Sequence, residues 1–457
     1  MHDWDDAERR AERAQELFDQ RRWSEALDEL RAAAAINPYN AGWHYHAGLA
    51  LDEMGRHPEA ADAYRRALEV EPNDLRAMTR LGAALRRAGD PAAAIATFER
   101  VEAIDADYEP AYCHRIPAYA DLGDHDRAEE MFYLARQVRD ECPDCYHHLG
   151  ASLLDRGLLD KAVWCFRRAR DLDADYPQID LRLAGALWRR GDREAARRHF
   201  LSALRRDPGD TAALIDFGEL LVELGRVEEA GEKFRRAIEL APDRPAGHFH
   251  LGLWLARNGG AVGLLGGQAA AAERAMDAFR RALTLDPTFP VAHLRLAALH
   301  HARGERALAR RHLRAEVLLR PRDPRVLLEL SNLLVDTGLA RTAVACLKRL
   351  VAADPGHAQG WQNLAVAQFL SDRFDDGIAS CQRCLAADPK NVMAVYNLAL
   401  AHERLGRYED AARWIADGLR LAPRDASLQQ LELRVRVLRW KERLGRVVRR
   451  VVRRPTR

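Results

Sequence analysis

Residues 41–74 read AGWHYHAGLALDEMGRHPEAADAYRRALEVEPND, and this 34-residue stretch decides the fold. It carries a glycine, Gly48, where two helices must approach each other, and an alanine, Ala60, in the helix that follows. The aromatic residue Tyr64 comes four residues later, and Pro72 ends the second helix because proline cannot continue it. The stretch therefore predicts two short helices that pack closely together.

The same pattern occurs twelve times between Ala7 and Asp425, with one insertion of 11 residues. The repeats begin at residues 7, 41, 75, 109, 143, 177, 211, 245, 290, 324, 358 and 392. Eleven of the twelve residues at repeat position 8 are small, and nine repeats carry proline at position 32. A period this regular is typical of a stacked array and not of a globular enzyme domain.

Two further columns support this register. Position 20 is alanine in every repeat except repeat eleven, where it is Gly377. Position 24 is aromatic in seven repeats, and we expect these side chains to bury apolar area between repeats. They are Tyr64, Phe98, Phe132, Phe166, Phe200, Phe234 and Phe279.

These columns, with Trp361 at position 4 and Leu-Gly pairs such as Leu81-Gly82 and Leu149-Gly150, resemble the tetratricopeptide repeat family. The resemblance extends over about nine tenths of the chain. It implies an all-α, right-handed superhelical solenoid of antiparallel helix pairs, whose first helices line a concave groove. Members of the family typically bind peptides or partner proteins there, and the family is mainly non-catalytic.

The repeats divide the chain into a lead of residues 1–6, an array of residues 7–425, and a capping helix with a basic tail in residues 426–457. The insertion lies in repeat eight at about residues 259–269 and contains five glycines, which predict a loop. No Lys-Ser or Lys-Thr pair follows it, so it is not a phosphate-binding loop. It is either a tolerated insertion or an arm that docks a partner through Val262, Leu264 and Leu265.

Composition narrows the class of protein. The formal net charge is +2, so the chain as a whole does not have the charge of a nucleic-acid-binding protein. An odd number of cysteines, seven, argues against a disulfide scaffold. The N-terminus is acidic and lacks the apolar segment of a secretory signal, and no apolar run reaches membrane-spanning length. We therefore expect a cytoplasmic protein.

Repeat position 6 is polar or ionisable in all twelve repeats, and the resemblance places it in the groove. One cluster there is rich in amides, which can donate to and accept from an extended peptide backbone. It comprises Asn332, Gln359, Gln362, Asn363 and Asn397, with Tyr396 beside them. A second cluster, Arg76, Arg80, Arg86 and Arg87, could anchor the carboxylate of a ligand, but a salt-bridged surface is the simpler explanation.

Cys142 and Cys145 form a C-x-x-C motif at the start of a helix, where a thiol has a lowered pKa. His114 and His148 share position 6 of adjacent repeats, and Cys113 and His147 share the neighbouring column. Three interpretations remain open here: incidental cysteines, a zinc site, or redox chemistry. A second C-x-x-C, Cys381 and Cys384, occupies core columns. No cofactor is predicted.

The last 32 residues carry a net charge of +9 and include Arg446, Arg449, Arg450, Arg453 and Arg454. Leu428, Leu431, Val435 and Leu438 have helical spacing and should dock on repeat twelve as a cap. The charge beyond them could engage an anionic surface, or it could fold back on the chain's own acidic body.

No arrangement of nucleophile and base recurs among the repeats, so we expect no enzyme and no small-molecule substrate. The sequence predicts a scaffold that binds a partner protein or an extended peptide in its groove. The alternative is a regulatory module that its basic C-terminal helix recruits to a membrane or a nucleic acid. A third hypothesis is a metal-dependent or redox-active protein built around repeat five.

Overall fold

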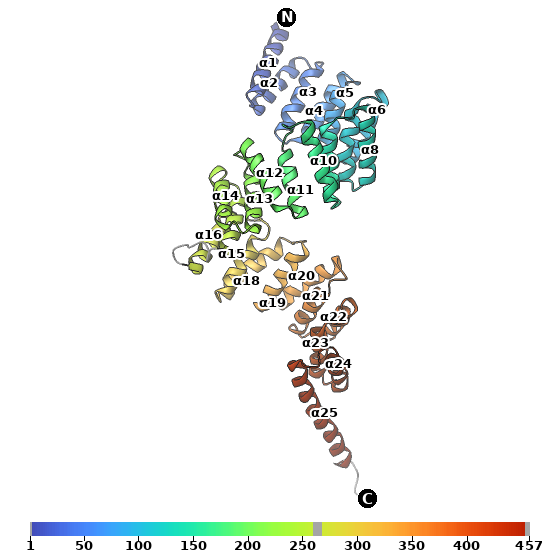
Figure 1. Cartoon of the computed structure of the whole chain (residues 1–457), viewed down its shortest axis with the longest axis vertical. Coiled ribbons are helices and arrows are strands. Elements are labelled where there is room, and N and C mark those ends of the chain that lie inside the picture. Colours follow the sequence, from blue (N-terminus) through green and yellow to red (C-terminus); the bar gives the residue numbers. More distant parts are fainter. Residues whose placement is uncertain (1, 259–266, 453–457) are drawn as a thin grey trace. The chain divides into compact units, whose positions relative to one another are not determined.

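A computed structural model of the chain describes residues 2–258 and 267–452. In this described part the chain forms 25 α-helices and no strand, and consecutive helices pack as pairs (Figure 1). This confirms the predicted all-α array of antiparallel helix pairs. Residues 259–266, which carry most of the insertion and its residues Val262, Leu264 and Leu265, lie outside the described residues.

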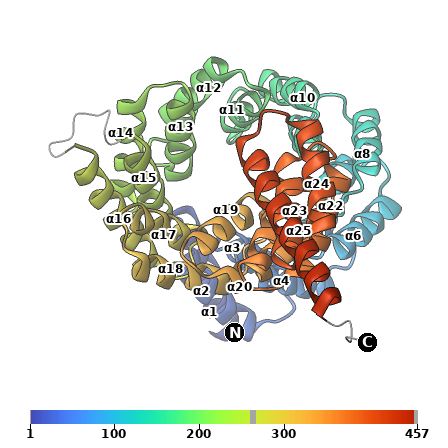
Figure 2. The same cartoon turned by 90° about the horizontal axis from the view of Figure 1, so that it is seen from below.

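The chain divides into an N-terminal unit, residues 1–224, and a C-terminal unit, residues 225–457. The helices of the N-terminal unit are α1 His2–Asp19, α2 Trp23–Ile36, α3 Ala41–Glu53, α4 His57–Val70, α5 Leu75–Arg87, α6 Pro91–Ile104, α7 Glu109–Asp121, α8 His125–Val138, α9 Pro143–Asp155, α10 Leu159–Leu172, α11 Ile179–Arg190, α12 Arg193–Arg206 and α13 Thr211–Glu223. In this unit Figure 2 shows the second helices α8, α10 and α12 on the outer side.

The C-terminal unit contains the remaining helices. They are α14 Val227–Leu240, α15 Pro245–Asn258, α16 Gly267–Leu285, α17 Ala292–Ala302, α18 Arg306–Leu318, α19 Pro324–Asp336, α20 Ala340–Ala353, α21 Ala358–Phe369, α22 Phe374–Ala387, α23 Val392–Arg404, α24 Tyr408–Leu421 and α25 Ala426–Val452.

In the eleven repeats whose turn the structure describes, the turn between the two helices contains one residue with positive φ, at repeat position 15. Glycine fills this position in nine of these repeats, from Gly55 with φ +71° to Gly406 with φ +70°. Arg21 and Asp372 adopt the same left-handed conformation, each with φ 59°, in the two described repeats that lack glycine there. In these repeats the column follows the end of the first helix, because few other conformations reverse the chain so tightly, and the sequence pattern alone did not single it out.

The small residues at position 8 face the aromatic residues at position 24 of the same repeat. A β-carbon on Gly82 would lie 2.5 Å from Cε1 of Phe98, and one on Gly150 would lie 2.8 Å from Cε1 of Phe166. The aromatic rings therefore fill the space that the missing side chain leaves. They also reach the next repeat, since Phe98 stacks on His114 with ring centroids 5.8 Å apart. The rings therefore make the contact between repeats that the sequence predicts, and also a contact within their own repeat that it does not predict.

Repeat eleven reverses this arrangement. Its position 24 is Cys381, and its position 20 is Gly377 instead of alanine. A β-carbon on Gly377 would lie 2.2 Å from Cε1 of Phe369, so the aromatic ring now comes from the first helix and rests on the second. The helix pair keeps one aromatic ring against one glycine, but the ring lies near the end of α21.

Helix α25 begins against α23 and α24 and continues beyond them (Figures 1 and 2). Leu428, Leu431 and Val435 are buried, and Leu438 is partly buried, as the spacing of these residues predicts. In the described part of the chain, no helix is both long enough and apolar enough to cross a membrane.

The glycine–aromatic contact gives a direct test of the register. We expect Gly82→Ala to cost about 1–3 kcal/mol of the free energy of unfolding, because its β-carbon would overlap the Phe98 ring. Gly185→Ala in α11 is the matched control, since no heavy atom lies within 4 Å of its β-carbon and its φ is not positive. Alanine should stabilise that helix by roughly 0.5–1 kcal/mol. Urea unfolding measures both, and effects of the same sign would contradict the packing.

Candidate functional site

The side chains at position 6 meet from one first helix to the next. Arg295 Nη1 of repeat nine lies 2.5 Å from Glu329 Oε1 of repeat ten. The rings of His114 and His148, in repeats four and five, have centroids 6.1 Å apart. We call the column of polar side chains at position 6 on the first helices of each unit the position-6 row.

The predicted amide cluster lies on α19, α21 and α23 of the C-terminal unit. Asn363 of the position-6 row donates from Nδ2 to Oδ1 of Asn332, on the preceding first helix, over 2.7 Å. Among the described residues, Asn363 Oδ1 accepts no hydrogen bond. This pairing holds the Asn363 side chain in one orientation and leaves its carbonyl oxygen able to accept from a ligand.

A pocket of about 190 Å³ is lined by residues of α21, which carries Asn363, of α22, and of α23. The polar residues that line the pocket are Asn397, with its side-chain amide, and Arg404, with its positive charge. The rest of the lining is apolar and comprises Val366, Phe369, Leu370, Phe374, Leu400 and Ala401. Phe369 is the aromatic residue that, in repeat eleven, lies on the first helix and packs against Gly377 of the second. This reversed placement of glycine and aromatic ring puts Phe369 in the pocket lining.

Asn397 Nδ2 is buried and has no hydrogen-bond partner in the part of the chain that the structure describes. A buried donor left in this state costs about 1–3 kcal/mol, so its retention calls for a reason. Gln359 is exposed on α21, whereas Gln362 and Tyr396 are partly buried on α21 and α23. The structure thus brings Asn332 and Asn363 into direct contact and sets Asn397 in a pocket that the sequence did not predict.

The predicted arginine patch lies on α5 of the N-terminal unit. Arg86 pairs with Asp121 at 3.0 Å, and Arg87 pairs with Asp52 at 3.5 Å. Arg76 lies 3.7 Å from Asp74, the residue that caps its own helix. Arg80 is exposed and forms no ion pair with any described residue. Because three of the four charges are partly neutralised by acids of the chain, the patch is weaker than its sequence indicates.

Helix α25 presents a second surface. Leu433, Val437, Trp440 and Leu444 are exposed at helical spacing, on the face opposite the buried Leu428, Leu431 and Val435. We call this row the α25 stripe. Arg434 pairs with Glu403, and both Arg439 and Arg443 pair with Glu409, so part of the basic charge does fold back on repeat twelve. The side chains of Arg446, Arg449, Arg450, Arg453 and Arg454 lie outside the described residues.

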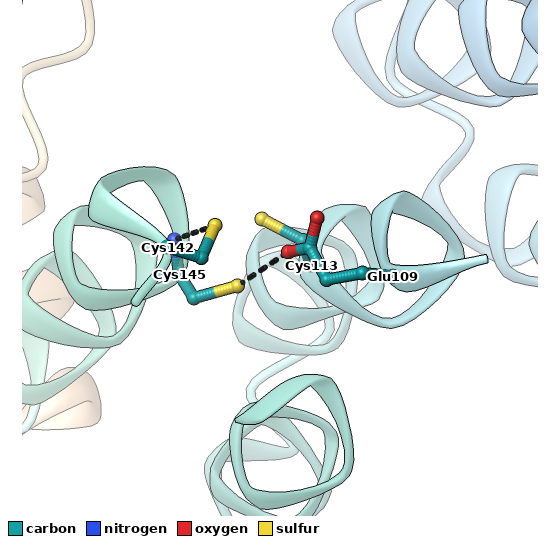
Figure 3. A group of neighbouring side chains, drawn as sticks. All are labelled: Glu109, Cys113, Cys142 and Cys145. Carbon is teal, nitrogen blue, oxygen red and sulfur yellow. Dashed lines mark hydrogen bonds between the residues drawn. The ribbon is translucent and has the colours of Figure 1, made fainter. Parts of the chain in front are cut away.

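A buried cluster joins repeats four and five. The ligand atoms of Glu109, Cys113, Cys142 and Cys145 all lie within 4.8 Å of one another, and their side chains converge from α7 and the start of α9 (Figure 3). Cys145 Sγ donates to Glu109 Oε1 over 2.9 Å, and Cys142 Sγ accepts from the Cys145 amide over 3.4 Å. These four residues, the Cys₃Glu cluster, are at most 8% exposed.

Electrostatics inside the cluster are strongly perturbed. Burial raises the pKa of Glu109 to about 7. Hydrogen bonds with Cys113 and Cys145 hold the pKa of the Cys142 thiol well below its usual range, and the same contacts raise the pKa of Cys113. Such shifts are typical of acidic groups that share one enclosed space and cannot all ionise without a counter-charge.

The structure brings only two of the four candidate metal residues into this cluster. Cys142 and Cys145 belong to the cluster, but His114 and His148 do not. The rings of these two histidines lie near each other in the position-6 row. Burial lowers the pKa of His114 to about 4 and that of His148 as well, so both are neutral at pH 7.

Cys113 and Glu109 complete the cluster instead. Their i, i+4 spacing on α7 is the sequence signal that would have found Glu109. Cys381 and Cys384 are fully buried in α22, as a core position predicts.

Several solved structures are similar to this chain. Yeast Tom70 is 15% identical with a TM-score of 0.39, and the match covers 96% of each chain. The human IFIT1 dimer with m7Gppp-AAAA is 17% identical with a TM-score of 0.46, over 84% of this chain and 90% of that one. PilF of Pseudomonas aeruginosa is 24% identical with a TM-score of 0.38, over 50% of this chain and 98% of that one. No curated protein gives a significant match to the sequence.

A family model described as tetratricopeptide repeat matches residues 11–69, 45–109, 181–245, 328–392 and 371–426. These matches together cover more than half of the chain and include the first helices that carry the amide cluster. The family is typically non-catalytic, and its repeat arrays generally serve as protein-binding scaffolds. The chain belongs to the tetratricopeptide repeat family.

Proposed function

We propose that this chain is a non-catalytic scaffold that binds a partner protein through an extended peptide segment on the first helices of repeats ten to twelve. The observation that carries the proposal is the hydrogen bond between Asn363 and Asn332, since the helix that carries Asn363 also lines the pocket that holds Asn397. Side-chain amides at this spacing can hold the donors and acceptors of an extended backbone.

The pocket supplies the specificity in this proposal. Its volume of about 190 Å³ suits one apolar side chain of the peptide, which would contact Phe369 and Leu400. Asn397 Nδ2 then donates to a peptide carbonyl and so gains the partner that it lacks in the described chain. Only Arg404 carries a charge in the pocket lining, so binding should depend weakly on salt.

The amide pair can be tested with peptides selected by the full chain from a display library of short random peptides. We expect Asn363→Ala and Asn397→Ala each to reduce the binding free energy of a selected peptide by about 1–3 kcal/mol, measured by calorimetry. Asn73→Ala, an exposed asparagine between α4 and α5, is the control and should bind as the wild type does. Peptides that bind a protein carrying both Asn363→Ala and Asn397→Ala with wild-type affinity would contradict this site.

Asn397→Leu separates a role in binding from a role in stability. Leucine has a similar size but leaves no donor unpaired, so the free energy of unfolding should rise by about 1 kcal/mol. Peptide affinity should fall by at least the amount that alanine costs, because the donor is gone. A leucine variant that is less stable would show that the amide serves the fold instead.

The exposed α25 stripe favours a second function, recruitment to an anionic membrane. Trp440 is 63% exposed in line with Leu433, Val437 and Leu444, while the opposite face of the helix docks on repeat twelve. Apolar residues flanked by arginine and lysine are the arrangement by which amphipathic helices lie on anionic membranes. Exposed rows of this kind are uncommon without a partner.

Vesicle binding tests this second function. We expect Trp440→Ala and deletion of residues 446–457 to weaken binding to vesicles rich in phosphatidylserine, in a sedimentation assay at low salt, with the fold unchanged. Trp164→Ala is the matched control because Trp164 is 58% exposed on α10 and does not belong to the α25 stripe. Binding to nucleic acid without binding to vesicles, or equal binding of all variants, would exclude the membrane.

A further inference from the structure

We propose that Glu109, Cys113, Cys142 and Cys145 form a closed structural site for one Zn²⁺ ion that joins the first helices of repeats four and five. Their four ligand atoms already lie within 4.8 Å of one another. Tetrahedral zinc with bonds of about 2.3 Å to sulfur requires ligand atoms about 3.8 Å apart. Small rotations of the side chains therefore suffice, and no helix has to move far.

The local structure explains how four donors converge. Glu109 and Cys113 are four residues apart on α7, so both point from the same side of that helix. Cys142 is the N-cap residue of α9, and its sulfur accepts from the amide of Cys145, three residues later. Pro143 between them occupies the first helical position, where a missing N–H costs nothing. The cap thus aims both thiols of the C-x-x-C motif at α7 (Figure 3).

Burial argues that the cluster holds a cation. No lysine or arginine of the described chain forms an ion pair with Glu109, which is only 8% exposed. Buried carboxylates are otherwise paired or coordinate metals, because an isolated buried charge is very costly. A divalent cation resolves the conflict among the four acidic groups, and the N-terminus of α9 stabilises thiolates there.

The donor set selects the metal. Three thiolates favour zinc, copper(I) or an iron–sulfur cluster over magnesium and calcium. The carboxylate of Glu109 is too hard a ligand for copper(I), and an iron–sulfur cluster usually requires four cysteines. Zinc accepts sulfur and carboxylate oxygen together in a tetrahedral site. All four positions come from the protein and are buried, which is the form of a structural and not a catalytic zinc site.

Redox chemistry of the C-x-x-C motif explains less. A disulfide between Cys142 and Cys145 would use two of the four groups and leave the Cys113 thiol and the Glu109 carboxylate buried without a purpose. Zinc uses all four.

The position of the site also has a structural reason. Repeat four departs furthest from the pattern, with Ile116 in place of the glycine at position 8 and Pro117 inside α7. Arg115 is 4% exposed, and its Nε and Nη2 find no partner among the described residues. A metal link from α7 to α9 offsets the cost of these departures, because metal binding adds directly to the stability of the folded state.

The proposal is tested on the full chain purified with reducing agent and without chelator. We expect about one equivalent of zinc by elemental analysis, and cobalt added to the reduced, metal-free protein should give the charge-transfer and visible bands of tetrahedral thiolate coordination. Cys142→Ser keeps an N-cap oxygen for α9 but removes a ligand, so zinc affinity should fall by at least about 100-fold, more than loss of an outer-shell partner costs.

Two further variants keep the test decisive. Cys384→Ser removes a thiol of the other C-x-x-C motif and should leave the zinc content unchanged. Glu109→Gln keeps the shape of the fourth ligand and should alter the cobalt spectrum even if Cys142→Ser fails to fold. A folded, reduced wild-type protein that takes up neither zinc nor cobalt overturns the proposal. So does a Cys142–Cys145 disulfide that persists under reducing conditions, or equal zinc binding by all variants.

Discussion

The contact between a glycine at position 8 and an aromatic ring at position 24 is the constraint on which the packing of the repeats that carry both residues depends. At Gly48, Gly82, Gly150 and Gly252, the ring lies so close that even a methyl group would overlap it. The two helices are thereby held at one separation, and the first helices stack at regular intervals. That regular stacking places equivalent side chains of successive repeats in contact, as Arg295 and Glu329 show.

The sequence was enough to predict the helices and the position-6 row, because a strict period relates residues that are distant in the chain. The sequence did not reveal which repeat positions pack against each other. The rings at position 24 were expected between repeats, yet they rest first on the glycine of their own repeat. At repeat position 15, Arg21 and Asp372 stand in place of glycine and still adopt a positive φ. The turn therefore requires the left-handed conformation even where the residue type does not indicate it.

The candidate sites were less predictable because they depend on contacts that the period does not encode. The pocket at Asn397 exists because Phe369 replaces the usual ring at position 24 and lies on Gly377. The Cys₃Glu cluster joins two pairs of residues about thirty positions apart, and only the packing of α7 beside α9 brings them together. A C-x-x-C motif signals half of such a cluster, while the acid that completes it looks like any other helical glutamate.

Both sites lie where the chain departs from its own pattern. Repeat four lacks the glycine at position 8 and shares the four buried acidic groups of the Cys₃Glu cluster with repeat five, and repeat eleven exchanges the places of its glycine and its ring. Among the described residues, Asn397 Nδ2 has no hydrogen-bond partner, and Glu109 is buried without an ion pair. The cost of each must be offset by something that these groups bind. In a chain this repetitive, the irregular positions carry the information about function, since the regular ones are already accounted for by the fold.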